Sequence, residues 1–209
     1  PDFGAVEIEG IERVSIEDIR HAAELGFRVK LLGVAQRSGR GLETRMAPCL
    51  VPASSPLGQL EGATNMVVLE GDAVGQIVLR GAGAGEGPTA SAVMADVMDL
   101  ARGLRLPVFG QPSGTLEPAT PARSAAPAPY YLRMTLSDKP GALARVAHVL
   151  GEAGVSIDRM RQTSHTAPEA PVLIVTHTTT RDALDTALAG LPETGVVLGA
   201  PVALRIEAV

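Results

Sequence analysis

Four glycines alternate with small residues over 81–87, in the run Gly81-Ala82-Gly83-Ala84-Gly85-Glu86-Gly87. The run follows a strand-like segment over 76–79 and leads into an expected helix over 91–98. Because glycine has no Cβ and tolerates positive φ, such a bend lets another group approach the backbone closely. The helix start behind it offers unpaired N–H groups and the positive end of the helix dipole. The pattern predicts a binding position for a phosphate or carboxylate, although tight strand-to-helix turns also use glycine.

Histidine and cysteine, the other residues that commonly do chemistry, show no such pattern. His21, His148, His165 and His177 are scattered and lack metal-ligand spacing, so the sequence predicts no metal site. Cys49 is the single cysteine and stands beside apolar Leu50, where burial is the ordinary outcome. A lone cysteine forms no intramolecular disulfide, which fits a reducing compartment.

The elements that would position these residues fall into two groups separated by a linker. The pattern over residues 1–103 predicts a mixed sheet and a helix over 16–25. The Ser15 hydroxyl can cap this helix, and Asp18 stands at the reciprocal position of a capping box. Residues 104–127 are rich in proline and alanine and predict an extended linker. The strands expected in the first group are 5–14, 27–34, 42–46 after a hairpin turn at 39–41, and two within 66–79.

Residues 128–209 predict a second, smaller domain. Strands are expected over 130–136, 155–160, 172–177 and 201–206, helices over 142–152 and 180–191, and a polar connection over 164–170. The order βαββαβ is that of a ferredoxin-like unit. The predicted fold class of the whole chain is therefore α+β.

Composition excludes several classes of partner. The 45% hydrophobic content supports a packed core, and the net charge of −5 comes without a basic stripe, so no nucleic-acid partner is expected. No apolar stretch is long enough to cross a bilayer, so no membrane partner is expected either. The chain starts Pro-Asp-Phe-Gly without an initiator methionine, and we expect a cytoplasmic piece of a longer protein.

Several segments, taken in order, resemble the later half of the homoserine dehydrogenase catalytic domain. They include Glu9-Gly10-Ile11, the stretch 24–33, Leu50-Val51-Pro52, Gly62-Ala63-Thr64-Asn65, and the glycine run with its continuation Pro88-Thr89-Ala90-Ser91-Ala92-Val93. The chain departs from the family where Ala82 replaces the usual proline, where Met66 follows Asn65, and where Ser55 replaces a common histidine. The C-terminal segment resembles an ACT regulatory domain, through Asp138-Lys139-Pro140-Gly141-Ala142-Leu143-Ala144 and Val155-Ser156-Ile157.

The resemblance implies a part of an enzyme that interconverts L-homoserine and L-aspartate 4-semialdehyde with NADP or NAD. That reaction feeds threonine, methionine and isoleucine synthesis. In the family, the Rossmann domain, the catalytic lysine and the acidic residues lie upstream of the segment resembled here, and neither Lys30 nor Lys139 matches that lysine. The resemblance therefore implies no catalytic residue in this chain, and a homo-oligomer formed through both domains.

The resemblance also implies two sets of binding residues. In the family the glycine run lies close to the cofactor, so the positions expected to contact NADP are Gly83, Ala84, Gly85 and Thr89. In the ACT segment, amides at the helix start can hold the α-carboxylate of an amino acid, and a carboxylate such as Asp138 can pair with its ammonium group. The expected effector is threonine, and the expected effector-binding residues are Asp138, Pro140, Gly141, Ala142, Ser156 and Ile157.

Two alternatives stay open at this point. Pro140 and Gly141 could serve only the turn, in a domain that dimerises without a ligand. The chain as a whole could work alone as an amino-acid-sensing dimer without catalysis.

Overall fold

The computed structural model describes residues 2–107, 109–162 and 169–208. His165 and most of the connection expected over 164–170 lie outside this part of the chain. The chain forms two compact units, one of residues 1–58 with 119–209 and one of residues 59–118. Strands and helices are mixed without a regular βαβ repeat, so the α+β class predicted from the sequence is confirmed.

The first unit is built on one seven-stranded sheet, in the order β1-β3-β9-β6-β8-β7, with β2 paired to β3. Its strands are β1 Glu7–Ile8, β2 Phe27–Ser38, β3 Gly41–Pro52, β6 Tyr130–Ser137, β7 Ile157–Gln162, β8 Glu169–Thr176 and β9 Val197–Ile206. Its helices are α1 Ile16–Glu24, α3 Ala142–Glu152 and α4 Arg181–Gly190, with 3₁₀ turns at Phe3–Ala5 and Pro192–Thr194.

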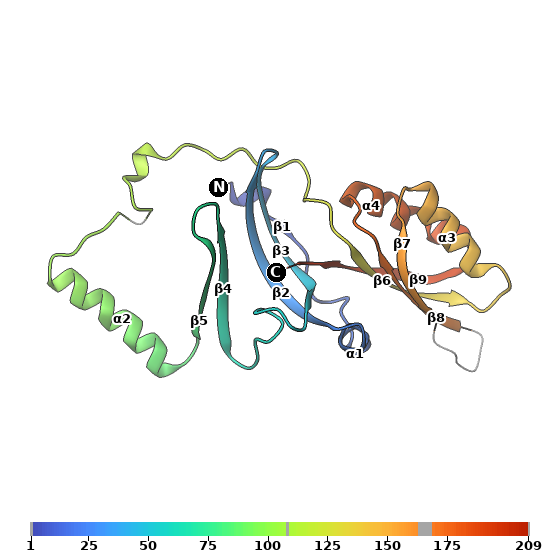
Figure 1. Cartoon of the computed structure of the whole chain (residues 1–209), viewed down its shortest axis with the longest axis horizontal. Helices are drawn as coiled ribbons and strands as arrows, with labels where there is room; N and C mark the ends of the chain where they lie inside the picture. Colours follow the sequence, from blue (N-terminus) through green and yellow to red (C-terminus); the bar gives the residue numbers. More distant parts are fainter. Residues whose placement is uncertain (1, 108, 163–168, 209) are drawn as a thin grey trace. The chain divides into compact units, whose positions relative to one another are not determined.

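The four strands β9-β6-β8-β7 and the helices α3 and α4 form the predicted βαββαβ unit (Figure 1). Both helices pack on one face of this part of the sheet, over a core that includes the fully buried Leu132, Val146 and Leu184. Successive side chains of β6 point to opposite faces of the sheet, so β6 contributes to a core on each face. Leu132 points to the core under α3 and α4, and Tyr131 points to the opposite face.

The N-terminal strands continue the same sheet. β3 pairs in parallel with β9 through Cys49 with Arg205 and Leu50 with Ile206. The sequence indicated a strand over 42–46 only, but β3 reaches Pro52 because Cys49 and Leu50 are fully buried between neighbouring elements. One sheet thus contains strands from both the N-terminal and the C-terminal segments.

Part of the expected linker also lies along β3. The amide of Ala122 donates to Leu42 O at 2.9 Å, and Leu42 N donates to Thr120 O at 2.8 Å. Glu43 accepts a hydrogen bond of 2.8 Å from the amide of Ala126. At the other end of the chain, the strand expected over 5–14 is reduced to Glu7–Ile8, since β1 finds a partner only at Arg45 and Met46 of β3.

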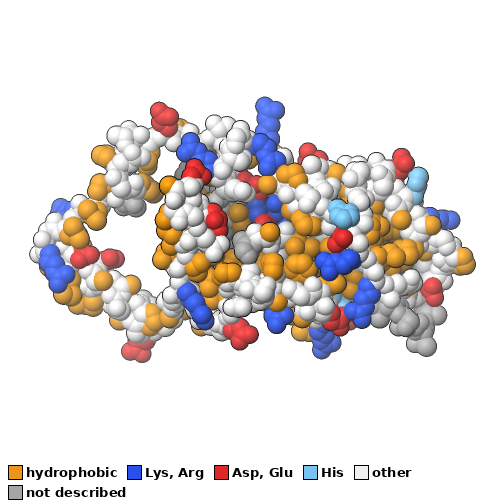
Figure 2. Space-filling model, viewed as in Figure 1, with side chains coloured by type: hydrophobic (Ala, Val, Ile, Leu, Met, Phe, Trp, Pro, Cys, Tyr) orange, Lys and Arg blue, Asp and Glu red, His pale blue; other side chains and the backbone are white. Residues whose placement is uncertain are grey.

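The second unit consists of the hairpin β4 Thr64–Gly71 and β5 Gly75–Ala82, the helix α2 Glu86–Ala101 and a 3₁₀ turn at Ser113–Thr115. None of its described residues is buried. Hydrophobic side chains are exposed along α2, among them Val93, Met94, Val97 and Met98 (Figure 2). None of the helices in the described ranges is both long and apolar enough to cross a membrane.

Candidate functional site

The glycine bend joins β5 to α2 and is open to solvent. The helix begins at Glu86 rather than at Ser91 as the sequence indicated, and Gly85 is its N-cap, with φ 127° and ψ 152°. No side chain caps this helix start. Residues 81–92 are all exposed, so the bend is not packed beneath other side chains of the described chain.

The donors of this helix start can be assigned from its sequence. Thr89 N donates to Gly85 O at 3.1 Å, and Pro88 has no N–H. The amides of Glu86 and Gly87 are therefore left without an intrahelical acceptor. The carboxylate of Glu86 adds negative charge beside them, which the helix dipole stabilises but which disfavours a second anion.

Asn65 of β4 belongs to the bend as well. A Cβ built on Gly83 would come within 1.6 Å of Asn65 Nδ2, so the side chain of Asn65 lies against the glycine backbone. By contrast, a Cβ on Gly81 or Gly87 would meet nothing within 4 Å. The bend thus offers two amide donors, one carboxylate and one side-chain amide on a surface without bulky groups.

A second candidate site is a hollow of about 350 Å³ at the start of α3. Four of the six predicted effector residues line it, namely Asp138, Pro140, Gly141 and Ala142. The other two do not: Ser156 and Ile157 lie at the start of β7, where Ser156 O accepts a hydrogen bond from His177 N at 2.8 Å. The opposite end of β7 contributes Gln162 instead.

The hollow combines a helix start without a side-chain cap and an unpartnered hydroxyl, although Ala142 N already donates to Lys139 O at 3.1 Å. Gly141 is the N-cap of α3, at φ 82°, and no side chain caps the helix. Ser137, the last residue of β6, also lines the hollow, and its Oγ is buried without a hydrogen-bond partner among the described residues. Such an orphaned group is expected to find its partner in a ligand or an ordered water.

Other candidate groups have structural surroundings. No set of histidine, cysteine and carboxylate side chains within the described ranges could hold a metal ion. Cys49 is fully buried, and burial raises the pKa of its thiol to about 12, so it is not a nucleophile. The hydroxyl of Ser55 donates to Pro52 O and accepts from Gly58 N, and it holds the turn after β3.

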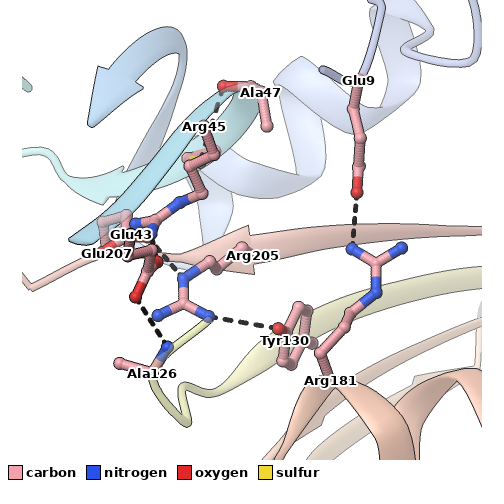
Figure 3. Close-up of polar contacts among 10 residues, drawn as sticks. Glu9, Glu43, Arg45, Ala47, Ala126, Tyr130, Arg181, Arg205 and Glu207 are labelled. Atoms are coloured by element: carbon pink, nitrogen blue, oxygen red, sulfur yellow. Dashed lines mark hydrogen bonds and ion pairs between the residues drawn. The ribbon is translucent and has the colours of Figure 1, made fainter. Parts of the chain in front are cut away.

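A buried charged network holds β9 to β3 (Figure 3). Arg45 pairs with Glu43 and Glu207, and Arg205 Nε donates to Glu207 at 2.5 Å. Arg205 Nη1 also donates to the hydroxyl of Tyr130 at 3.2 Å. The same view shows Arg181 of α4 pointing to Glu9, at 2.5 Å. The pairs of Arg45 and Arg205 satisfy charges that would be costly to bury alone, and they fasten the C-terminal strand to β3. The pair of Arg181 and Glu9 is exposed and joins α4 to the N-terminal segment.

Residues 1–98 match the family model of homoserine dehydrogenase, and residues 130–193 match that of the ACT domain. The crystal structure of a homoserine dehydrogenase from Thiobacillus denitrificans superposes with a TM-score of 0.86 at 36% identity, over 99% of this chain and 48% of that one. Residues 1–98 therefore belong to a homoserine dehydrogenase domain, and residues 130–193 form an ACT domain.

Curated homoserine dehydrogenases agree with this assignment over the whole chain. The Pseudomonas aeruginosa enzyme is 36% identical over 214 residues, covering 98% of this chain and 49% of its own length. The Bacillus subtilis enzyme is 31% identical over 212 residues, covering 99% of this chain and 48% of its own. The chain therefore spans about half the length of the homoserine dehydrogenases that it matches.

The two family matches contain the two candidate sites. The homoserine dehydrogenase match includes the glycine bend, and the ACT match includes the hollow at the start of α3. Sequence reasoning missed Asn65 as a neighbour of Gly83, although the residue stood in a motif. It also missed Ser137, although this residue directly precedes the predicted turn, and Gln162, whose type and position carry no local signal.

Proposed function

We propose that this chain supplies the cofactor-contacting rim and the regulatory domain of an NAD(P)-dependent homoserine dehydrogenase. Such an enzyme transfers a hydride between the nicotinamide and carbon 4 of aspartate semialdehyde, which becomes the carbinol carbon of homoserine. The family match over 1–98 and the coverage of about half of each relative support a role within a larger catalytic unit.

The observation that carries the proposal is the open bend at 81–87. Its uncapped amides at Glu86 and Gly87 are donors, and the Glu86 carboxylate is an acceptor. This combination suits the hydroxyls of a ribose or the carboxamide of a nicotinamide better than a phosphate, because Glu86 repels a second anion. The cofactor-binding residues proposed from the sequence, Gly83, Ala84, Gly85 and Thr89, lie in or directly after this bend.

The role of the bend is to position the cofactor. Hydride transfer requires the nicotinamide to be held within reach of the substrate carbon, with an acid or base at the oxygen. NAD(P)H supplies the hydride, and the backbone of the bend would fix the ring and ribose by hydrogen bonds. The proton would be handled by the lysine and acidic residues that the family carries outside this sequence.

The exposed apolar surface of the second unit supports the same proposal. A two-stranded hairpin is at best marginally stable in water, and an apolar helix that buries no side chain gains nothing from folding alone. We propose that a nucleotide-binding domain covers α2 and the hairpin and presents the cofactor to the bend.

Regulation is assigned to the hollow at the start of α3. The amides of the α3 start would hold an α-carboxylate, the Asp138 carboxylate would hold an ammonium group, and Ser137 Oγ would bond to a polar side chain. We propose threonine as the effector and a homo-oligomer as the assembly.

The test is a fusion of these 209 residues behind the unmatched half of the Pseudomonas aeruginosa relative. We expect the fusion to oxidise NADPH in the presence of aspartate semialdehyde, and the 209 residues alone to give no turnover. A folded fusion without activity would contradict the proposal, as would turnover by the isolated chain.

The hydroxyl of Ser137, which has no partner among the described residues, favours a second candidate function, because it is available to an amino-acid ligand whether or not catalysis occurs nearby. In that case the chain is an amino-acid-sensing module that works without a catalytic partner. Binding of L-threonine by calorimetry together with an inactive fusion would support this second function over the first.

A further inference from the structure

Helix α1, in the homoserine dehydrogenase part of the chain, covers the sheet face opposite α3 and α4. Its Ala22 is fully buried among Leu50, Tyr131 and Leu173, residues of β3, β6 and β8. The ACT part of the sheet is therefore packed on both faces, with its own helices on one and α1 on the other.

A buried carboxylate fixes the beginning of α1 to β6. Asp18 is fully buried, and its Oδ1 accepts hydrogen bonds from Tyr131 Oη at 3.0 Å and Arg133 Nε at 2.6 Å. Its Oδ2 accepts from Arg133 Nη2 at 3.1 Å and from the Ser15 amide at 2.8 Å. The residue that closes the capping box of α1 is thus also its attachment to the ACT sheet.

An exposed ion pair fixes the other end of α1 to β7, between Glu24 and Arg161. Arg133 and Arg161 both lie opposite Leu173 of β8, so the two arginines stand in one row across β6, β8 and β7. Residues directly opposite on neighbouring strands share a face, which places both arginines under α1.

The strands that carry these arginines end at the hollow. β6 ends at Ser137 and β7 at Gln162, and both residues line it. Between Arg133 and Ser137 the pairing of β6 with β9 is irregular: Arg133 is opposite Val202, whereas Thr135 is opposite Leu198. The extra residues lie on β9, where Gly199 has φ 73°, whereas β6 pairs regularly with β8 from Tyr131 to Ser137. Such a bulge bends the strand that carries it and re-aims its side chains beside β6.

We propose that α1 is the output element of the effector hollow: an amino acid bound there changes how β6 and β7 hold α1 through Asp18–Arg133 and Glu24–Arg161. The proposal rests on the proposed effector site. From α1 the change passes to the catalytic part, because β2 begins at Phe27, two residues after the helix cap Leu25, and Ala53 N donates to Gly26 O at 2.8 Å.

If a bound amino acid changes the contacts of α1, then a change in those contacts must in turn change the affinity for the amino acid. This affinity can be measured in the 209-residue chain. Calorimetry would give the Kd of L-threonine for the wild type, Glu24→Gln, Arg161→Gln, the double variant and Asp18→Asn. Asp185→Asn is the control, because it removes an exposed ion pair within α4 that does not touch α1. Hydrogen exchange of α1 amides, with and without L-threonine, is the second readout.

We expect Glu24→Gln to change the Kd about threefold or more, the double variant to add nothing further, and Asp185→Asn to leave it unchanged. Threonine should alter exchange in α1 of the wild type but not of Glu24→Gln. Since Glu24 is exposed, Glu24→Gln should still fold and allow the coupling to be measured even if Asp18→Asn does not fold. Binding with equal Kd values and unaltered α1 exchange would overturn the coupling alone, whereas no binding to the wild type would overturn the effector site and the coupling with it.

Discussion

Ser137 shows how a single unpaired atom can indicate a ligand. Its Oγ is buried in the hollow at the start of α3 without a partner in the described chain. Replacing Ser137 with alanine removes a buried hydroxyl that has no hydrogen-bond partner among the described residues, so the melting temperature should stay constant or rise slightly. L-Threonine affinity should fall about twofold to tenfold, the value of one neutral hydrogen bond.

Calorimetry of the wild type and Ser137→Ala gives the L-threonine affinities, and thermal unfolding gives the melting temperatures. Thr194→Ser, at a hydroxyl that bonds Leu191 O outside the hollow, is a suitable control for the handling of the variants. Equal affinities of wild type and Ser137→Ala would remove Ser137 from the site.

Asp18 is a buried carboxyl whose ionisation contributes to stability. Burial alone would raise the pKa of this carboxyl, but hydrogen bonds from Arg133 and Ser15 outweigh it and hold the pKa below its ordinary value. A carboxyl with a lowered folded-state pKa contributes stability above its unfolded pKa of about 3.9, and the contribution is lost as the pH falls through the folded-state pKa.

Asp18→Asn should therefore lower the free energy of unfolding by about 3 kcal/mol at neutral pH, the usual effect of breaking a buried pair. The difference from the wild type should shrink as the pH falls below about 4. Urea unfolding at several pH values measures this, and a difference that is independent of pH would show that the charge of Asp18 is not what matters.

At the level of elements, the turn before α3 depends on one glycine. Gly141 has φ 82°, and a Cβ there would meet nothing within 4 Å, so an alanine would be strained by its backbone alone. Gly141→Ala should destabilise the protein by about 1 kcal/mol or more. It should also weaken amino-acid binding, because the amides of the α3 start would move.

Gly151, inside the same helix, is the matched comparison. A Cβ there also meets nothing within 4 Å, but the residue does not have positive φ. Gly151→Ala should stabilise the protein by about 0.5 kcal/mol. Thermal unfolding compares the two variants, and opposite signs are expected; the same sign in both would contradict the role of positive φ at Gly141.

Local elements could be predicted from the sequence because their signals are local. The capping box of Ser15 and Asp18, the helix over 142–152 and the turn that leads into it follow from residue types at short spacing. Four of the predicted effector residues come together for the same reason, since they are neighbours in one turn.

What the sequence could not indicate are pairings between distant segments. Asp18 bonds to Tyr131 and Arg133, which lie more than 100 positions away, and no spacing rule connects them. The pairing of β3 with β9 depends in the same way on which buried edge finds which partner. Gln162 becomes a neighbour of the turn only once β6 and β7 are aligned through β8.

On the scale of the molecule, the two units differ in how they hold themselves together. Residues 1–58 and 119–209 share one sheet with buried side chains on both faces. Residues 59–118 contain no described buried residue, although they carry the bend on which the proposed function depends. Regulation is therefore proposed for the unit that has its own buried core, and cofactor contact for the unit that has no described buried residue.

The most direct test of this account is cofactor kinetics of the active fusion with a methyl group added at the bend. Gly85 is unsuitable because its φ of 127° strains any other residue, whereas Gly87 lies in the first turn of α2 and a Cβ there meets nothing. Gly87→Ala should raise the KM for NADPH about tenfold, the effect of losing roughly 1.4 kcal/mol of binding, with an unchanged KM for aspartate semialdehyde. Gly114→Ala, in the 3₁₀ turn at Ser113–Thr115 and equally open, lies outside the bend; it is the control and should behave as the wild type. An unchanged KM for NADPH in Gly87→Ala would contradict the claim that the bend contacts the cofactor.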